Sequence, residues 1–126
     1  MISKKILIIE DEKILSELIS SKLGREGYQV LAAYNGEEGI KAIKRYKPDL
    51  ILLDIVMPKK NGFEVLKEIS KDNKLKHIPV IIISNSGQLI EINKAIKWGV
   101  KDWLIKTEFD PQEVVQKVKK ALSNPT

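Results

Sequence analysis

Short apolar runs recur along the 126-residue chain and alternate with stretches long enough to form helices. Four of the five runs consist mainly of Ile, Val and Leu, which is typical of strands buried on both faces of a parallel sheet. The alternation predicts an α/β fold of the (βα)₅ type, a doubly wound, parallel, five-stranded sheet with helices on both faces. The expected strands are Lys5–Ile9, Gln29–Ala33, Leu50–Leu53, Val80–Ile83 and Trp103–Ile105.

The other stretches carry apolar residues at helical spacing, as expected of helices that pack against a sheet. Gly24 and Gly27 predict the end of the first helix, and Pro48 stops the second helix before the third strand. Asp110 and Pro111 predict the N-cap and the first residue of the last helix. The expected apolar stripes are Ile14, Leu15, Leu18, Ile19 and Leu23; Ile40 and Ile43; Phe63, Leu66 and Ile69; Leu89, Ile92 and Ile96; and Val114, Val118 and Leu122.

Length and composition predict one domain over residues 1–126, with a folded core of about 4–123 and no output domain. The chain has no cysteine, which excludes disulfides, thiolate metal sites and a cysteine nucleophile. No apolar run approaches the roughly 20 residues that cross a bilayer, so we expect a cytoplasmic protein that does not contact a membrane. The net charge is +5, but the lysines are spread along the chain, so we expect no direct binding of nucleic acid.

Polar or charged residues follow four of the five expected strands. In open α/β sheets, ligands bind at the carboxyl ends of the strands, where the strand order reverses. Glu10 and Asp11 follow the first strand, and Asp54 follows the third. With the strand order 2-1-3-4-5 these two strands are neighbours, so three carboxylates converge. Ser84 follows the fourth strand and Lys106 the fifth.

Three converging carboxylates repel one another, so a positive charge must lie near them. Lys106 supplies one such charge, and a hard divalent cation is the natural second. A set of oxygen ligands without histidine or cysteine favours Mg²⁺ or Mn²⁺ over Zn²⁺. The sequence therefore predicts a site for one of these two cations at the carboxyl edge of the sheet.

In type and spacing these residues resemble the receiver domains of bacterial two-component response regulators, in particular the single-domain chemotaxis type. The resemblance extends from Lys5 to about Leu122 and includes Met57-Pro58-x-x-Asn61-Gly62 beyond Asp54. It implies a flavodoxin-like, three-layer αβα fold. It also implies a signalling phosphoacceptor that is not an enzyme in the usual sense, because it catalyses only its own phosphorylation and slow dephosphorylation.

The resemblance also assigns roles to the site residues. Asp54 would accept a phosphoryl group from the phosphohistidine of a sensor histidine kinase or a histidine phosphotransfer protein. Asp11, Asp54 and the backbone carbonyl of Val56 would bind Mg²⁺, for which Mn²⁺ can substitute, and Glu10 would hold metal-bound water. Lys106 would pair with the phosphoryl oxygens.

A conformational switch is implied as well. Ser84 would offer its hydroxyl to the phosphoryl group, and Trp103 would move into the space that the Ser84 loop leaves. The face formed by the fourth helix, the fifth strand and the fifth helix would then contact a downstream protein of unknown identity. The protein would act as a monomer or as a phosphorylation-dependent homodimer.

Two positions bear on how the site works. Thr107 follows Lys106 where the family usually has a proline and a cis peptide bond. We predict a trans bond here, because a cis bond without proline costs about 3–4 kcal/mol. Val56 cannot activate water, so we predict slow loss of the phosphoryl group. Because of Thr107, the alternative function is a degenerate receiver that acts as a phosphorylation-independent interaction module.

Other interpretations of the same residues stay open at this point. A flavodoxin-like cofactor site would need a phosphate loop rich in Ser, Thr and Gly after the first strand, where this chain has Glu10-Asp11-Glu12. A phosphohydrolase with a nucleophilic aspartate would need Asp-x-Asp after the first strand, and Asp54-Ile55-Val56 lacks the second aspartate. The simpler structural roles are a helix N-cap for Asp54, an acidic helix start for residues 10–12, a surface position for Lys106, a turn for Ser84 and a static aromatic side chain for Trp103.

Overall fold

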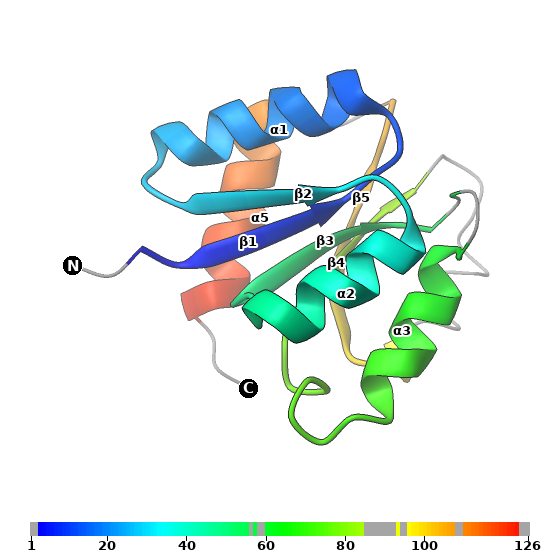
Figure 1. Ribbon diagram of the computed structural model, residues 1–126. Coiled ribbons are helices and arrows are strands. Elements are labelled where there is room, and N and C mark those ends of the chain that lie inside the picture. The colour runs from blue at the N-terminus through cyan, green and yellow to red at the C-terminus, as the bar shows by residue number, and fades with distance from the viewer. Residues whose placement is uncertain are drawn as a thin grey trace.

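A computed structural model describes residues 3–55, 57, 60–84, 93, 96–107 and 110–123 of the chain. The described strands form one five-stranded sheet in the order β2-β1-β3-β4-β5, and every neighbouring pair is parallel. The predicted doubly wound α/β fold and its strand order are therefore confirmed. The elements labelled in Figure 1 are β1 (Lys5–Ile9), α1 (Lys13–Arg25), β2 (Gln29–Ala33), α2 (Gly36–Tyr46), β3 (Leu50–Asp54), α3 (Gly62–Ser70), β4 (Val80–Ser84), β5 (Val100–Ile105) and α5 (Pro111–Ser123).

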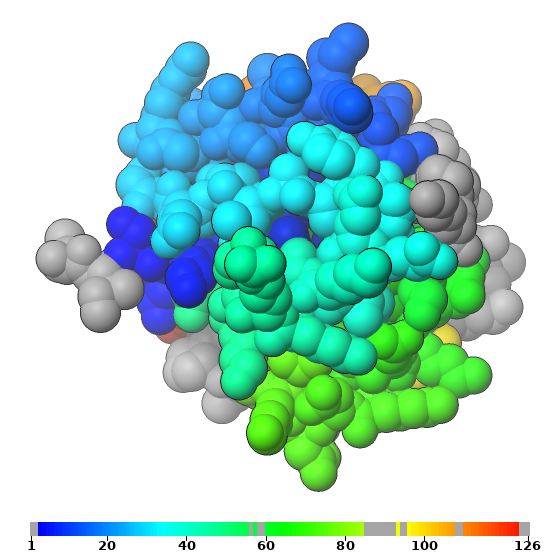
Figure 2. Space-filling view, viewed as in Figure 1, coloured from blue at the N-terminus to red at the C-terminus, as the bar shows by residue number. Residues whose placement is uncertain are grey.

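Helices cover both faces of the sheet and give the molecule three layers (Figure 1). α2 and α3 lie on one face, and α1 and α5 lie together on the other. The space-filling view shows α1 along the top and α2 and α3 in the centre and lower right, with part of β1 and β2 visible beside them (Figure 2). The structure therefore has the predicted flavodoxin-like, three-layer arrangement.

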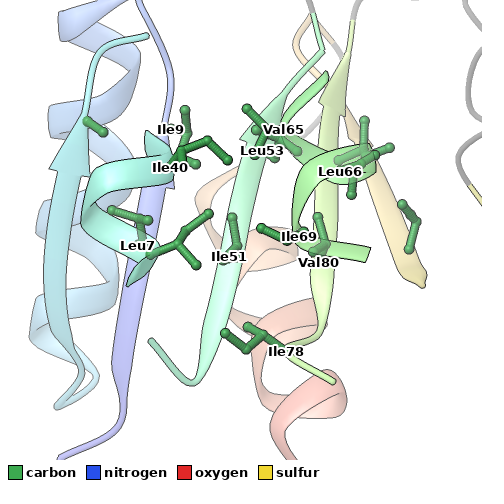
Figure 3. Close-up of a cluster of buried hydrophobic side chains, with 14 of the residues drawn as sticks. Leu7, Ile9, Ile40, Ile51, Leu53, Val65, Leu66, Ile69, Ile78 and Val80 are labelled. Atoms are coloured by element: carbon green, nitrogen blue, oxygen red, sulfur yellow. The ribbon is translucent and has the colours of Figure 1, made fainter. Parts of the chain in front are cut away.

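An apolar core lies on each side of the sheet, because alternate residues of a strand point to opposite faces. Leu7 and Ile9 of β1 pack toward α2 and α3, as Figure 3 shows. Ile6 and Ile8 of the same strand belong to the core under α1 and α5. Every residue of β3 and β4 is buried. Burial on both faces explains why the central strands are almost continuously apolar.

The observed strands extend beyond the predicted ones at three points. β3 and β4 include Asp54 and Ser84 as their last residues, and β5 begins at Val100 rather than at Trp103. Among the described strands, β5 is an edge strand paired with β4, and its residues vary from buried to exposed. Charged residues therefore interrupt its apolar pattern, which is why the apolar runs predict only its second half.

The first helix buries a narrower face than its apolar residues predict. Ile19 and Leu23 are buried, whereas Ile14 and Leu18 are 85% and 52% exposed. The predicted stripe is wrong at these two positions, because five apolar residues span more of the helix circumference than the sheet covers. Gly27, with φ of +96°, then turns the chain into β2.

The last helix begins as predicted. Asp110 is its N-cap, since the side chain accepts a hydrogen bond from the α5 backbone at 2.8 Å. Of the predicted fourth stripe, Leu89 and Ile92 lie outside the described residues, and Ile96 is exposed. Among the helices that the structure describes, none has both the length and the apolar character needed to cross a membrane.

Candidate functional site

Two carboxylates are buried side by side at the carboxyl edge of the sheet. β1 and β3 are paired so that Ile9 lies beside Leu53, which makes Glu10 and Asp54 neighbours. Glu10 is fully buried and Asp54 is 1% exposed. Asp11 is exposed, but one oxygen from each of the three carboxylates lies within 4.8 Å of the others. The predicted convergence of three carboxylates is therefore present.

Lys106 places its ammonium group among these carboxylates. Its backbone N–H donates a hydrogen bond of 2.8 Å to the carbonyl of Ser84, which fixes the start of the loop after β5. Its Nζ lies 3.0 Å from Asp54 Oδ2 and 3.3 Å from Glu10 Oε2. The side chain is only 13% exposed, so Lys106 is not an ordinary surface lysine.

Glu12 is a third partner of Lys106 that the sequence analysis missed. Its Oε2 lies 2.7 Å from Lys106 Nζ, and its side chain is 59% exposed. Glu12 occupies the N-cap position of α1, but its side chain makes no capping hydrogen bond. Glutamate is not among the preferred N-cap residues. Its presence at the start of α1 was the one sequence feature that could have indicated another role for Glu12.

The pKa values in this cluster are shifted by burial and by the neighbouring charges. Burial raises the pKa of Glu10 to about 8, and the Asp54 charge adds to this effect, although a hydrogen bond from the Glu12 backbone N–H opposes it. Burial lowers the pKa of Lys106, but hydrogen bonds to Glu12 and Asp54 outweigh this effect and leave that pKa raised. The carboxylates thus hold Lys106 firmly in its charged form.

The donor set fits a hard divalent cation. Three carboxylate groups converge, and Glu10 Oε1 is buried with no hydrogen-bond partner among the described residues. A buried carboxylate oxygen without a donor calls for a cation or an ordered water molecule. Oxygen ligands of this kind are typical of a receiver Mg²⁺ site. The predicted backbone ligand Val56 lies outside the described residues.

The two predicted switch residues lie on the neighbouring strands β4 and β5. Ser84 is the last residue of β4, and its buried Oγ has no hydrogen-bond partner among the described residues. Trp103 is 38% exposed on β5. Lys117 of α5 donates a hydrogen bond to the Trp103 carbonyl, and its Nζ lies 5.9 Å from the centre of the Trp103 ring.

The geometry excludes one of the simpler structural roles. Asp54 is not a helix N-cap, because the N-cap of α3 is Asn61. The acidic run leads directly into α1 with Glu12 at its N-cap, so the acidic helix start is present together with the site. The part of the chain that the structure describes has no cis peptide bond, so the predicted trans bond between Lys106 and Thr107 is confirmed.

Asn61 and Gly62 tie α3 to the site. Asn61 and Glu64 form a capping box, which is a more specific role than the turn expected for Asn61-Gly62. The Gly62 N–H donates a hydrogen bond of 2.8 Å to the carbonyl of Ile55. A Cβ atom on Gly62 would lie 2.5 Å from the backbone oxygen of Asp54. The start of α3 therefore packs directly against the end of β3.

Comparison with known proteins agrees with this geometry. Residues 6–119 match the family model of the response regulator receiver domain. The chain is 35% identical over 118 residues to the chemotaxis protein CheY of Thermotoga maritima, a match that covers 93% of this chain and 96% of that protein. It is 34% identical over 120 residues to the alkaline phosphatase synthesis transcriptional regulatory protein PhoP of Bacillus subtilis, covering 95% of this chain and 49% of that protein. The chain thus spans about half the length of this second relative.

A solved structure has the same fold. A protein assigned as a response regulator from Chloroflexus aurantiacus matches with a TM-score of 0.90 at 28% identity, covering 98% of this chain and 100% of that chain. Receiver domains are signalling phosphoacceptors rather than conventional enzymes, and they partner histidine kinases. From its parallel sheet, its acidic pocket and a family match over nearly its whole length, we conclude that the chain belongs to the response regulator receiver domain family.

Proposed function

We propose that this chain is a phosphoacceptor response regulator, in which Asp54 accepts a phosphoryl group from a phosphohistidine. The donor would be a sensor histidine kinase or a histidine phosphotransfer protein. The observation that carries the proposal is the position of the Asp54 carboxylate, which is buried at the end of β3 and lies 3.0 Å from Lys106 Nζ. A carboxylate in such a setting can act as a nucleophile toward phosphorus.

The transfer needs no further reactant. An oxygen of Asp54 bonds to phosphorus while the P–N bond of the phosphohistidine breaks. The imidazole leaves with the electron pair of that bond and takes up a proton. Negative charge is spread over the three remaining phosphoryl oxygens during this step. Lys106, held charged beside Asp54, is placed to stabilise these oxygens.

A divalent cation would add to this stabilisation. We assign Asp11, Asp54 and the backbone carbonyl of Val56 as its direct ligands, and Glu10 as the residue that holds its bound water. The converging carboxylates and the unpartnered Glu10 Oε1 support this assignment. Mg²⁺ bound there would neutralise part of the negative charge on the phosphoryl group, and Mn²⁺ can take its place.

Ser84 and Trp103 are the proposed switch residues. Ser84 would donate its hydroxyl to a phosphoryl oxygen, which would satisfy the buried Oγ that now has no partner among the described residues. Trp103 would turn from its exposed position toward the space left by the Ser84 loop. The change would alter the surface of β5 and α5, through which the protein would contact its downstream target or, after phosphorylation, a second copy of itself.

We further propose that residues 1–126 act in the cytoplasm as a single-domain regulator without direct contact with nucleic acid or a membrane. The match to nearly the full length of the Thermotoga chemotaxis protein supports the single-domain assignment. The alternative is a degenerate receiver that works only as an interaction module. Lys106 reaches Asp54 although Thr107 replaces the usual proline, and this contact favours the phosphoacceptor.

Intact-protein mass spectrometry tests the proposal. The protein is incubated with acetyl phosphate and Mg²⁺, and the number of added phosphoryl groups is counted. We expect one group on the wild type and none on Asp54→Asn or with a metal chelator present. Asp49→Asn serves as the matched control, because Asp49 precedes the opposite end of β3. An unmodified wild-type protein would reject the phosphoacceptor function in favour of the interaction module.

A further inference from the structure

Glu12 forms the shortest ion pair of Lys106, although it is not one of the three converging carboxylates. The distance from Nζ is 2.7 Å to Glu12 Oε2, against 3.0 Å to Asp54 and 3.3 Å to Glu10. The Glu12 backbone N–H also donates to Glu10 Oε2 at 3.0 Å. Glu12 thus contacts the site through both its backbone and its side chain.

The three contacts use the full donor capacity of Lys106. An ammonium group has three N–H donors, and Lys106 Nζ has three carboxylate partners. A phosphoryl oxygen can therefore bind Nζ only if one carboxylate gives up its hydrogen bond. The phosphoryl group and Glu12 compete for the same donor.

The burial of the three carboxylates determines which of them leaves. Glu10 and Asp54 are buried, so neither can exchange the ammonium group for water. The Glu12 side chain is 59% exposed and makes no capping bond that would hold it in place. Its carboxylate can move into solvent at little cost, because exposed ion pairs are weak.

We propose that Glu12 is a displaceable positioning residue, which holds Lys106 while Asp54 is unmodified and slows phosphorylation because it must release the ammonium group. This inference rests on the proposed function of Asp54. It predicts a role for a side chain that neither binds the metal nor receives the phosphoryl group. Without Glu12, Lys106 would have a free donor for the incoming phosphoryl oxygens.

Phosphorylation kinetics test the inference. With acetyl phosphate and Mg²⁺, we expect Glu12→Gln to raise the rate constant for modification of Asp54 by about 1.4-fold to fivefold, the range set by one exposed ion pair. Glu17→Gln is the matched control, because Glu17 is exposed on α1 and makes no ion pair with Lys106 among the described residues. It should leave the rate within experimental error of the wild type.

A second variant, Glu12→Asp, distinguishes the effect of the contact with Lys106 from the effect of a negative charge at position 12. Aspartate at an N-cap position bonds to the helix backbone, and its side chain is one methylene shorter. Glu12→Asp should therefore keep the charge, lose the contact and accelerate the reaction as Glu12→Gln does. A wild-type rate for Glu12→Asp would overturn the inference, as would equal acceleration by Glu17→Gln.

A measurement without phosphorylation keeps this inference distinct from the proposed function. In the metal-free protein, the effects of Glu12→Gln and Lys106→Met on the free energy of unfolding should be non-additive, because the two side chains are in contact. Additive effects would contradict the proposed contact between Glu12 and Lys106, even if Asp54 is phosphorylated. The other outcome is that the two effects are non-additive but the wild type takes up no phosphoryl group. That result would reject only the proposed function and the kinetic role of Glu12 that depends on it.

Discussion

Lys106 and Asp54 are 52 positions apart in the chain, yet Nζ of the lysine lies 3.0 Å from Oδ2 of the aspartate. The contact depends on the sheet, because β3 and β5 both flank β4 and end at the same edge. It places a charged donor beside the carboxylate that we propose as the nucleophile. Most of the expected chemistry of the site depends on this pair.

The first prediction concerns that pair. Lys106→Met should slow phosphorylation of Asp54 by acetyl phosphate about tenfold to a hundredfold, since a hydrogen bond to a charged group contributes about 1.5–3 kcal/mol. Stopped-flow or quenched mass spectrometry gives the rate. Lys4→Met removes an exposed lysine before the start of β1 and should have no effect. Equal rates for Lys106→Met and the wild type would remove Lys106 from the mechanism.

The second prediction concerns the pH dependence of stability. The pKa of Glu10 rises from an ordinary value of 4.5 to about 8 on folding, chiefly because the carboxyl group is buried. The folded state therefore binds this proton more tightly than the unfolded state does. The stability that Glu10 contributes is fully present below about pH 4.5 and is lost as the pH rises through about 8.

Denaturant unfolding of the metal-free protein at several pH values checks whether the free energy of unfolding falls as the pH rises. We expect the wild type to lose stability between about pH 5 and pH 8, and Glu10→Gln to lose distinctly less. Glu17→Gln, with the same change of charge on exposed α1, should keep the wild-type slope. Mg²⁺ should bind more weakly as the pH falls through this range, because the cation competes with the Glu10 proton. A stability that rises with pH in wild type but not in Glu10→Gln would contradict the prediction.

The fold and the convergence of the main candidate site residues could be predicted because both follow from local sequence patterns. The central strands are buried on both faces, so their apolar runs end abruptly at the residues that face the site, such as Glu10 and Asp54. Parallel strands of known order then bring those ends together. Position along the chain was enough to predict that these residues lie together, without knowledge of any side-chain contact.

Other features depend on tertiary contacts that no local pattern reveals. The link from Glu12 to Lys106 joins residues 94 positions apart, and an acidic residue at a helix start has a simpler explanation. The exposure of Ile14 follows from which side of α1 meets the sheet. The first half of β5 was missed because an edge strand tolerates charged residues such as Lys101.

The third prediction concerns the close approach of α3 to the site. Gly62→Ala should destabilise the protein by about 1–3 kcal/mol, because the added Cβ would lie 2.5 Å from the backbone oxygen of Asp54 and must displace backbone. Since Asp54 moves with that backbone, phosphorylation should slow as well. Gly24→Ala is the control, as its Cβ meets nothing within 4 Å and the residue lies within α1. It should be neutral or stabilise by up to about 1 kcal/mol. If Gly62→Ala leaves the free energy of unfolding unchanged, the backbone at the start of α3 can shift to accommodate the added Cβ atom.

The fourth prediction concerns the movement of Trp103. Its ring is 38% exposed and lies against Lys117, whose Nζ is 5.9 Å from the ring centre. If phosphorylation draws the Ser84 loop toward Asp54, the ring should become buried and its fluorescence emission should shift to shorter wavelength. The chain has two tryptophans, so the measurement uses Trp98→Phe, which leaves Trp103 as the sole reporter.

The same variant provides the controls for this prediction. In the Trp98→Phe background, Ser84→Ala should still accept a phosphoryl group, as counted by mass spectrometry, but should lose most of the spectral shift. The reason is that the buried Ser84 Oγ is the group proposed to couple the phosphoryl oxygens to the loop. Lys117→Met should blue-shift the emission of Trp103 before phosphorylation, because it removes the ammonium group that lies over the ring and bonds to the Trp103 carbonyl. An unchanged emission spectrum in a fully phosphorylated protein would mean that Trp103 stays in place and that the signal leaves the site by another route.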